Sequence, residues 1–393
     1  MKLVLFGAGK IGRSFIGQLF SRSGFHVVFI DKDRLLIDAL NRERSYCVLI
    51  YDKRPETIVV ENVSGVYVDD HQNVAEEIAS ADVLAVSIGK AGLLHIIPVL
   101  SMGLLLREKK YPGRILDIIL AENMRNADAF FYESLSKMLP DDFPLDKNIG
   151  LVETSIGKMV PLATKRNNDD ILSVAAEAYN TLIVDKKAFK NPIPDVAGLE
   201  AKDHIKAWVD RKLFIHNFGH AAVAYLGYRY HPDKVYLWEA LEDKEIRNMV
   251  KAGMTQSAEV LHYIYPCVFT REDLYEHIED LLSRFANVDL ADTIFRVGCD
   301  LYRKLAPDDR IVVPLLTALQ NNLPYEMIIQ VFAAALHFKA TGADGQMFPA
   351  DADFHMEFKN KGIEGILRDV CGFTDDRVEK LRNDIHTKVK IQL

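Results

Sequence analysis

The sequence predicts an α/β protein in which a doubly wound parallel sheet is followed by an all-α domain. Three observations predict this arrangement. Short apolar runs alternate with segments of helical spacing over the first half of the chain, which is typical of a parallel sheet with helices on both faces. A glycine-rich turn directly follows the first apolar run. From about residue 197 onward, long segments of helical spacing replace the strand-like runs.

The first elements are predicted to be a strand, a tight turn, a helix and a second strand. Residues 2–6 (KLVLF) form an apolar run that stops at glycines, and residues 13–23 carry apolar side chains at helical spacing. A second apolar run at 25–30 ends in Asp31, and another helical segment begins at Leu35. Strand, helix and strand in this order form the unit from which parallel sheets are built.

The rest of the first half continues the sheet after an insertion. Residues 46–69 alternate apolar and polar side chains around 52–55 (DKRP), which predicts an inserted hairpin. Further parallel strands are expected at 83–88 and 115–121, where the apolar runs resume.

A proline-containing segment, 191–194 (NPIP), breaks the alternation. We therefore expect one domain at 1–192 and a second, helical domain at 193–393. The segments with the clearest helical spacing in the second half are 204–226, 235–264 and 311–339.

Composition limits the class of protein. The 393 residues suit two domains, and 49% hydrophobic with 26% charged residues is typical of a soluble enzyme. The formal net charge of −8 argues against a general affinity for nucleic acid or an anionic membrane. No apolar run reaches the roughly 18 residues of a membrane span, and the N-terminus lacks the apolar core of a signal peptide. We expect a cytoplasmic protein that binds a small molecule.

The glycine-rich turn predicts a dinucleotide-binding site. It matches G-x-G-x-x-G, follows a strand, opens a helix, and precedes an acid, Asp31, at the end of the next strand. This context favours a Rossmann-type domain with the pyrophosphate at the helix N-terminus. A glycine turn without a ligand is the alternative. The expected cofactor-binding residues are Gly7, Gly9, Lys10, Ile11, Gly12 and Asp31.

Asp31 also predicts which nucleotide binds. Its carboxylate would accept hydrogen bonds from the ribose hydroxyls and would repel a 2′-phosphate, so NAD is expected rather than NADP. Lys32 and Arg34 follow directly, and either could turn toward such a phosphate and weaken the preference.

Residues 210–220 (DRKLFIHNFGH) are the most polar part of an otherwise apolar helical segment. A lysine in a partly apolar cleft can act as a base, because burial disfavours its charged form. Asn217 and His220 could donate hydrogen bonds to an oxygen that gains alkoxide character. A solvated amphipathic face is the alternative. At about 100° per residue, one broad helix face carries Lys212, His216, Asn217 and His220.

Nothing in the sequence predicts a metal site. The four cysteines lie far apart without a C-x-x-C pair, and His216 with His220 lacks the glutamate of an H-E-x-x-H motif.

Over nearly its whole length, the chain resembles the polyol-specific long-chain dehydrogenases. The most specific feature is the K-x4-N-x2-H signature at Lys212, Asn217 and His220, which follows a Rossmann-type half. The other matching segments are 6–13 (FGAGKIGR), 15–17 (FIG), 121–124 (AENM), 183–186 (IVDK), 189–190 (FK), 211–214 (RKLF), 219–221 (GHA), 224–227 (AYLG) and 334–338 (AALHF).

The resemblance implies a Rossmann domain followed by a helical domain, an active site between them, and hydride transfer without a metal. It implies that Lys212 is the base. It also implies that Asn217, His220 and Asn123 of the (D/E)-N motif bind and polarise the reacting oxygen. The family usually shows Val-Asp-Arg before a hydrophobe and a proline, whereas this chain has Gly157 and Lys158 in 156–161 (IGKMVP). That segment lies near the substrate in relatives, so the departure leaves the identity of the sugar alcohol open.

We expect the chain to interconvert a hexitol phosphate and a ketose phosphate with NAD. The alternatives are a hexuronate or unphosphorylated polyol dehydrogenase of the same family, and a non-catalytic NAD-binding regulatory protein. Retention of the signature residues and Asn123 argues against the last. The expected partner is a small sugar alcohol or its phosphate, and the sequence determines no oligomeric state, a monomer being compatible with it. The candidate cations for a phosphate are Lys158, Arg296, Arg303 and Lys304.

Overall fold

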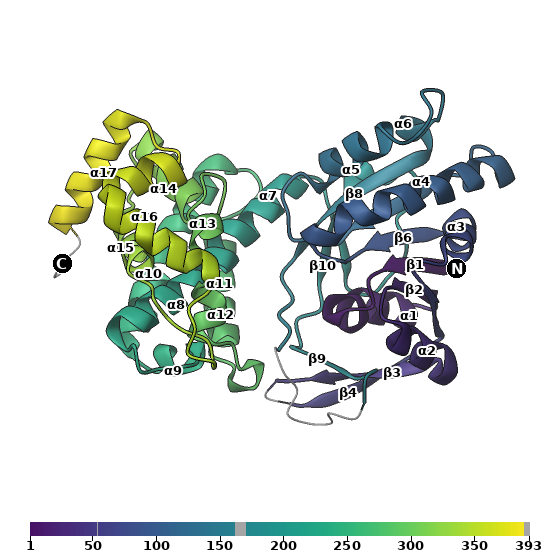
Figure 1. Ribbon diagram of the computed structural model, residues 1–393, viewed down its shortest axis with the longest axis horizontal. Helices are drawn as coiled ribbons and strands as arrows, with labels where there is room; N and C mark the ends of the chain where they lie inside the picture. The colour runs from purple at the N-terminus through teal and green to yellow at the C-terminus, as the bar shows by residue number, and fades with distance from the viewer. Residues whose placement is uncertain (53, 162–169, 389–393) are drawn as a thin grey trace. The chain divides into compact units, whose positions relative to one another are not determined.

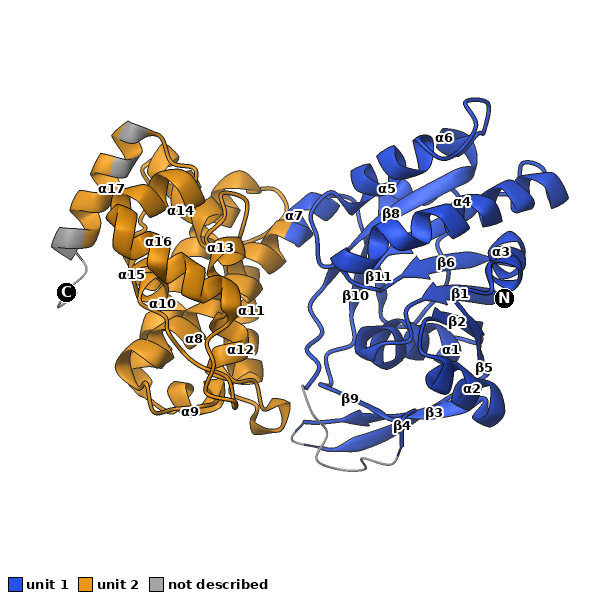
Figure 2. Ribbon diagram, viewed as in Figure 1, with its two compact units in different colours: residues 1–209 blue, residues 210–393 orange. Residues whose placement is uncertain are grey.

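The structure is a computed structural model that describes residues 1–52, 54–161 and 170–388. The chain divides into two compact units, Met1–Val209 (unit 1) and Asp210–Leu393 (unit 2), as Figure 2 shows. The sequence places its domain boundary earlier, at residues 192 and 193, where prolines interrupt the periodic pattern.

An eight-stranded sheet forms the centre of unit 1 (Figure 1). Its neighbouring strands are parallel except for one antiparallel pair, β8 with β10. The predicted α/β class is therefore confirmed. Across the sheet the strands are β11 (Leu199–Lys202), β10 (Leu182–Asp185), β8 (Ile149–Ile156), β7 (Leu116–Leu120), β6 (Val83–Val86), β1 (Lys2–Phe6), β2 (His26–Asp31) and β5 (Val63–Tyr67).

The order of the strands reverses next to β1. From β1 the chain adds β2 and then β5 on one side, and it returns to place β6, β7 and β8 on the other. Ligands of open α/β sheets bind at the carboxyl ends of the strands, at such a reversal. The carboxyl ends of β1 and β6 therefore mark the expected ligand site of unit 1.

Helices cover both faces of the sheet, because successive side chains of a strand point to opposite faces. Leu5 of β1 belongs to a hydrophobic cluster with Phe15 of the first helix, whereas Val4 belongs to a second cluster with Leu100. The helices of the first cluster are η1 (Gly12–Gly17, a π-helix), α1 (Gln18–Arg22) and α2 (Arg34–Glu43), and those of the second are α3 (His71–Ser80), α4 (Leu93–Lys110) and α5 (Ala127–Ser136). Shorter helices are η2 (Lys90–Gly92), α6 (Leu145–Asn148) and η3 (Lys186–Ala188), and α7 (Ile205–Arg211) runs across the unit boundary.

One stretch of unit 1, Lys90–Lys110, has the length and mean hydropathy (1.4) of a membrane-spanning helix, and 50% of it is buried. It comprises η2 and α4. Leu93, Leu100 and Leu104 of this stretch lie in the second cluster, and α4 packs along α3 (Figure 1). These contacts are those of a core helix in a globular domain.

A second, smaller sheet contains the predicted insertion. β3 (Ser45–Ile50) and β4 (Glu56–Glu61) form the expected antiparallel hairpin, and β9 (Val174–Ala176) joins β3 in parallel. The insertion is shorter than predicted, because β5 leaves the hairpin and pairs with β2 of the main sheet. Alternation of apolar and polar residues shows that a segment is a strand, but not which strand it pairs with.

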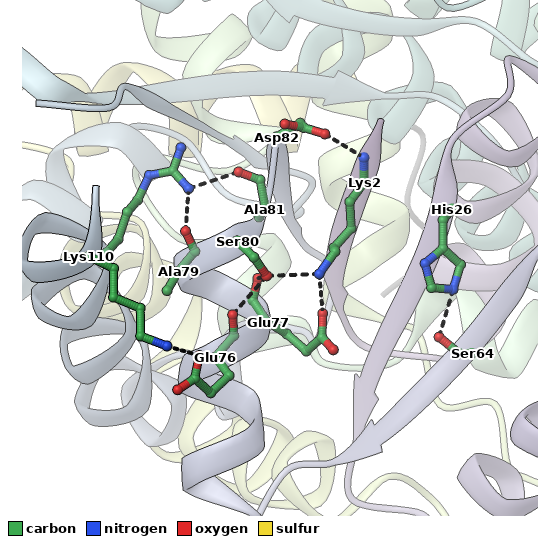
Figure 3. A network of polar contacts seen from close by, with 11 residues as sticks. Lys2, His26, Ser64, Glu76, Glu77, Ala79, Ser80, Ala81, Asp82 and Lys110 are labelled. Carbon is green, nitrogen blue, oxygen red and sulfur yellow. Dashed lines mark hydrogen bonds and ion pairs between the residues drawn. The ribbon is translucent and has the colours of Figure 1, made fainter. Parts of the chain in front are cut away.

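Polar contacts join α3 to the amino-terminal ends of the strands of the main sheet (Figure 3). These are the strand ends opposite the glycine turn. The Lys2 amine donates to Glu77 at 2.7 Å and to Ser80 at 2.8 Å, and its backbone N–H donates to Asp82 at 2.8 Å. Nearby, the Arg107 guanidinium donates to the carbonyls of Ala79, Ala81, Arg114 and Ile115. These contacts belong to the scaffold of unit 1, because they lie at the strand ends away from the glycine turn.

Unit 2 is helical, as predicted, and its described residues form no strand beyond isolated bridges. The sheet extends slightly past residue 197, because β11 belongs to unit 1. Helix α8 packs against α10, α12 and α15 and lies at the centre of the unit. The helices are η4 (Lys212–Asn217, a π-helix), α8 (Phe218–Tyr230), α9 (Leu237–Leu241), α10 (Lys244–Ile264), α11 (Arg271–Phe285), η5 (Val288–Leu290), α12 (Ile294–Gly298), α13 (Leu301–Lys304), α14 (Val312–Asn321), α15 (Glu326–Leu336), α16 (Pro349–Gly365), η6 (Ile366–Val370) and α17 (Asp375–Lys388).

Candidate active site

The glycine turn after β1 is tightly packed at two of its glycines and open at the third. Gly7 has φ +100°, and a Cβ atom there would lie 2.1 Å from the carbonyl oxygen of Ser87. A Cβ atom on Gly12 would lie 2.0 Å from the carbonyl oxygen of Gly7, so helix and turn touch at this glycine. A Cβ atom on Gly9 would meet nothing within 4 Å. Gly7 and Gly12 are therefore required by the fold, whereas Gly9 borders open space that a ligand can approach.

Arg13, which directly follows the motif, is buried and supports the turn. Its guanidinium donates to the carbonyl of Ala8 at 2.8 Å and to those of Ile171 and Leu172 at 2.8 and 2.6 Å. Burial lowers the pKa of Arg13 below its ordinary value. The G-x-G-x-x-G motif specifies only the glycines, so the sequence alone does not identify Arg13 as part of the cofactor site.

Asp31 ends β2 beside the turn. One carboxylate oxygen accepts a hydrogen bond from the backbone N–H of Ala8 at 2.6 Å, and the other accepts one from Asp33 at 3.0 Å. A carboxylate has about four acceptor positions, so capacity remains for two ribose hydroxyls. The residues present therefore fit a nucleotide with a free 2′-hydroxyl.

The other predicted residues of the turn have different environments. Lys10 is exposed and donates to the carbonyl of Pro161 at 2.6 Å. Ile11 packs against the first hydrophobic cluster. The Arg34 guanidinium lies over the Tyr67 ring, 4.1 Å from its centre, and Tyr67 is the register partner of Asp31 in the pairing of β2 with β5.

A second loop joins the site at the ends of β6 and β7. Buried Glu122 accepts hydrogen bonds from the backbone N–H groups of Ile88 at 2.7 Å and Gly89 at 3.1 Å. Burial raises the pKa of this carboxyl, although the two hydrogen bonds act in the opposite direction. Glu122 thereby fixes the start of the loop that carries Asn123, which is exposed. The acidic residue of the (D/E)-N motif therefore has a structural role in unit 1.

In unit 2, Lys212 and Asn217 lie at the two ends of η4. The backbone N–H of Phe218 donates to the carbonyl of Leu213, five residues earlier, which is the hydrogen bond of a π-helix. Side chains five apart would be about 140° apart on an α-helix. In a π turn they come to the same side, as residues four apart do in an α-helix. The π turn therefore brings Lys212 and Asn217 closer in register than the sequence analysis assumed.

Lys212 is half-buried. Burial, and then the positive charge of Arg310, lowers its pKa from the ordinary value of 10.5 to about 8. Asn217 is half-buried as well, and its amide makes no hydrogen bond to any residue that the structure describes. A titratable amine and an amide with donor capacity can together remove a proton from a bound alcohol and stabilise its oxygen.

His220 is held by a carboxylate and an aromatic ring. Its Nε2 lies 3.0 Å from Oδ2 of Asp292, and its ring stacks on Phe285 with centroids 4.9 Å apart. Asp292 is buried, and its other oxygen accepts a hydrogen bond from Arg296. His216 packs edge-on against both His220 and Phe285 and is itself buried. The two imidazoles therefore differ in role, because only His220 contacts the acid.

The candidate cations lie in different surroundings. Lys158 belongs to unit 1, where it is buried, donates to Asn180 at 3.0 Å and lies over Phe15. Arg303 is half exposed and paired with Asp300 and Asp309. Lys158 thus belongs to the unit that does not carry the signature residues, and the charge of Arg303 is offset by acids of its own unit.

Two buried cations do lie close to the signature residues of unit 2. Lys304 donates to the carbonyl of Cys299, and burial followed by the charge of Arg310 lowers its pKa to about 8. Arg310 contacts Asp309 at 2.7 Å, and its charge acts on both lysines and on His220. No local sequence pattern links Arg310 or Asp292 to residues 212–220, so neither residue is predictable from the sequence.

Two family models match the chain, one over each half. The model described as the mannitol dehydrogenase Rossmann domain matches residues 1–198, and the one described as the mannitol dehydrogenase C-terminal domain matches residues 204–368. A solved structure of Pseudomonas fluorescens mannitol 2-dehydrogenase, a ternary complex with NAD and D-mannitol, has a TM-score of 0.76 at 14% identity and covers 99% of this chain and 91% of that chain.

Weaker matches extend to other dehydrogenases and reductases. A D-mandelate dehydrogenase with NADH and anilino(oxo)acetate has a TM-score of 0.49 at 12% identity, covering 85% of this chain and 97% of that chain. A PanE/ApbA family ketopantoate reductase from Ralstonia eutropha JMP134 has a TM-score of 0.49 at 14% identity, with the same coverage.

Proposed function

The chain belongs to the mannitol dehydrogenase family, and from this premise we propose that it is an NAD-dependent, metal-independent dehydrogenase of the mannitol-1-phosphate 5-dehydrogenase type. Its reaction interconverts a hexitol phosphate and a ketose phosphate. The proposed pair is mannitol 1-phosphate and fructose 6-phosphate. Membership of the mannitol dehydrogenase family supports the general description of the chain as a polyol oxidoreductase. The phosphate and the particular hexitol belong to the proposal.

The observation that carries the proposal is the half-buried amine of Lys212 beside Asn217. A general base works best when its pKa lies near the working pH, and the pKa of Lys212 is lowered to about 8. In its neutral form Lys212 accepts the proton of the substrate hydroxyl. Asn217 donates a hydrogen bond to the same oxygen as negative charge develops there. Asn123, carried by unit 1, is proposed as a second donor.

The residues of unit 1 hold the cofactor. The backbone N–H groups of the turn from Gly7 to Gly12 bind the pyrophosphate, and Asp31 accepts hydrogen bonds from the adenosine ribose. When bound, NAD supplies the acceptor of the electron pair that leaves the alcohol carbon. Asp31 also favours NAD over NADP, because a 2′-phosphate would lie against a carboxylate whose two oxygens already accept backbone hydrogen bonds.

A phosphorylated substrate is supported by the charges around Lys212. Lys304 and Arg310 are buried cations, and the positive charge of Arg310 lowers the pKa of both Lys304 and Lys212. Buried like charges are costly without an anion, and a phosphate dianion would offset that cost. We propose Lys304 as its main ligand, ahead of Arg310 and Arg296, which are already paired with Asp309 and Asp292.

An unphosphorylated polyol is the second candidate, favoured by the structural similarity to an enzyme solved with D-mannitol. The two candidates are separated by measuring kcat/KM with NAD for mannitol 1-phosphate, D-mannitol and a hexuronate, and in reverse for fructose 6-phosphate. We expect the phosphorylated pair to be turned over at the highest kcat/KM. Turnover of D-mannitol or the hexuronate with none of either phosphate contradicts the phosphate assignment while retaining the polyol chemistry.

Lys304→Gln and Arg303→Gln form a matched pair for the same test. If Lys304 binds the phosphate, its substitution should raise KM for mannitol 1-phosphate by on the order of 10-fold, the worth of one charged hydrogen bond. Arg303→Gln should leave KM near the wild-type value, because Arg303 is already paired with two aspartates. Equal effects of the two substitutions contradict the assignment of Lys304.

A further inference from the structure

We propose that Asp292 is a positioning residue that holds His220 as the Nε2–H tautomer, so that Nδ1 of His220 accepts a hydrogen bond from a substrate hydroxyl. This inference rests on the proposed function, because the hydroxyl belongs to the polyol. It changes the role expected for His220 from the sequence, where His220 donates to the reacting oxygen.

His220 and Asp292 are in direct contact. Nε2 of His220 lies 3.0 Å from Oδ2 of Asp292, a distance at which one proton lies between the two atoms. The other oxygen of Asp292 accepts a hydrogen bond from Arg296, which can only donate. A carboxylate in this position is an acceptor on both oxygens. The shared proton is therefore carried by His220 on Nε2.

The other ring nitrogen of His220, Nδ1, is left as an acceptor. In a neutral imidazole, the nitrogen opposite the N–H is an acceptor. Nδ1 of His220 has no hydrogen-bond partner within the described parts of the chain, and it is not one of the buried polar atoms that lack a partner. It therefore reaches the surface of unit 2 with its acceptor lone pair available.

Packing opposes a flip of the ring about its Cβ–Cγ bond. The ring stacks on Phe285 at an angle of 19° between ring planes, and His216 packs against its edge. A flip of the imidazole would break the hydrogen bond to Asp292 and leave that buried carboxylate without one of its partners. Packing and the hydrogen bond therefore fix which nitrogen points away from Asp292.

The His220 ring is uncharged in these surroundings. Burial lowers the pKa of His220 well below its ordinary value, and the surrounding cations act in the same direction. His216 adds a neighbouring imidazole, and Asp292 is the acid in contact with the ring. The neutral form therefore predominates at the working pH of the proposed base. The cations that face His220 from the packed elements are Arg296, Arg310, Lys304 and Arg284.

Together with the proposed function, this role of His220 divides the polar groups by function. Donation to the developing oxyanion is assigned to Asn217 and Asn123, whose amides can donate. His220 instead selects a substrate that carries a hydroxyl next to the reacting carbon, because only a donor satisfies Nδ1. A polyol has such a hydroxyl, and a simple secondary alcohol does not.

The test measures the tautomer directly, by ¹⁵N NMR of the histidine side chains in the full-length protein at pH 7.5. His220 is assigned from the signals that are lost in His220→Gln. We expect one protonated Nε2 and one unprotonated Nδ1. Protonation of Nδ1 alone, or of both nitrogens, in the wild-type protein overturns the proposal.

Asp292→Asn supplies the second readout, with Asp289→Asn as the matched control on an exposed aspartate nearby. Because Arg296 can only donate, it will hold the amide oxygen of the substituted side chain. The amide NH2 then faces His220, and the ring proton should move to Nδ1. We expect KM for mannitol 1-phosphate to rise by about 3- to 10-fold, the worth of one neutral hydrogen bond, with the KM for NAD unchanged.

Asp289→Asn should change neither the tautomer nor KM. An Asp292→Asn protein that is folded and keeps the wild-type tautomer contradicts the positioning role. If no polyol or polyol phosphate is turned over, the proposed function fails by itself, whereas the tautomer measurement needs no turnover and still decides the role of Asp292.

Discussion

At the scale of single residues, the chemistry of unit 2 depends on the protonation state of Lys212. A lysine with its ordinary pKa of 10.5 is only about 0.3% neutral at pH 8. With a pKa lowered to about 8, about half of the amine is neutral at that pH. Burial thus converts a residue that is ordinarily a permanent cation into a usable base.

We predict that kcat for alcohol oxidation rises with pH and levels off above an apparent pKa of about 8. The sign follows from the role of Lys212, which must be neutral to accept a proton. Reduction of the ketose needs the protonated amine, so its kcat should fall over the same range. The pH profiles of kcat in both directions measure this. An oxidation rate that falls as pH rises through this range contradicts the assignment.

Lys212→Ala should lower kcat by on the order of 10²–10⁴, the usual contribution of a general base. NAD binding should persist, because the glycine turn and Asp31 lie in unit 1. Lys244→Ala, at an exposed lysine of the same unit, is the matched control and should retain wild-type activity. A Lys212→Ala protein with normal kcat, shown to be free of wild-type enzyme, would leave the mechanism without its base.

At the scale of elements, the glycine turn contains one glycine that the fold requires and another that leaves room for a ligand. A side chain at Gly7 would collide with the backbone of Ser87 and would also require φ +100°, which side chains rarely adopt. A side chain at Gly9 meets open space. The same motif therefore contains glycines that are present for two different reasons.

We predict opposite outcomes for Gly9→Ala and Gly7→Ala. Gly9→Ala should leave the thermal unfolding midpoint within about 2 °C of wild type, because no atom must move, and should weaken NAD binding by on the order of 10-fold or more through the lost close approach of the backbone. Gly7→Ala should lower the unfolding midpoint by several degrees. Thermal unfolding and NAD titration of both variants test this, and unchanged NAD affinity in Gly9→Ala contradicts the location of the pyrophosphate.

At the scale of the whole molecule, periodicity predicts the two-part architecture and most elements of unit 1. The runs at 2–6 and 25–30 correspond closely to β1 and β2, because buried parallel strands are apolar on both faces. Pairing partners were less predictable. The sequence assigns Val63–Tyr67 to the hairpin, but these residues join β2 across the sheet, and local alternation contains no information on that choice.

The candidate site shows a similar limit. Lys212, Asn217 and His220 are recognisable because they lie within nine residues of one helix. Asp292 and Arg310, which act on His220 and Lys212, are 72 or more residues away from His220 in the chain. Only the packing of the helices of unit 2 brings such residues to the signature, so sequence spacing could not find them.

The π turn in η4 has a consequence for the helix that contains it. One extra residue rotates the part before it by about 100° relative to the part after it. Before the turn, Asp210 accepts a hydrogen bond from Tyr265 at 2.7 Å, and Arg211 lies over Phe269. After it, His220 reaches Asp292. The extra residue therefore orients the side chains before and after the turn so that one continuous helix can make both sets of contacts. Removing one residue between Lys212 and Asn217 would keep every functional group and restore a regular helix, yet it would force one set of contacts to be given up. The number of residues between Lys212 and Asn217 is therefore as important to the fold of unit 2 as the identity of the signature residues.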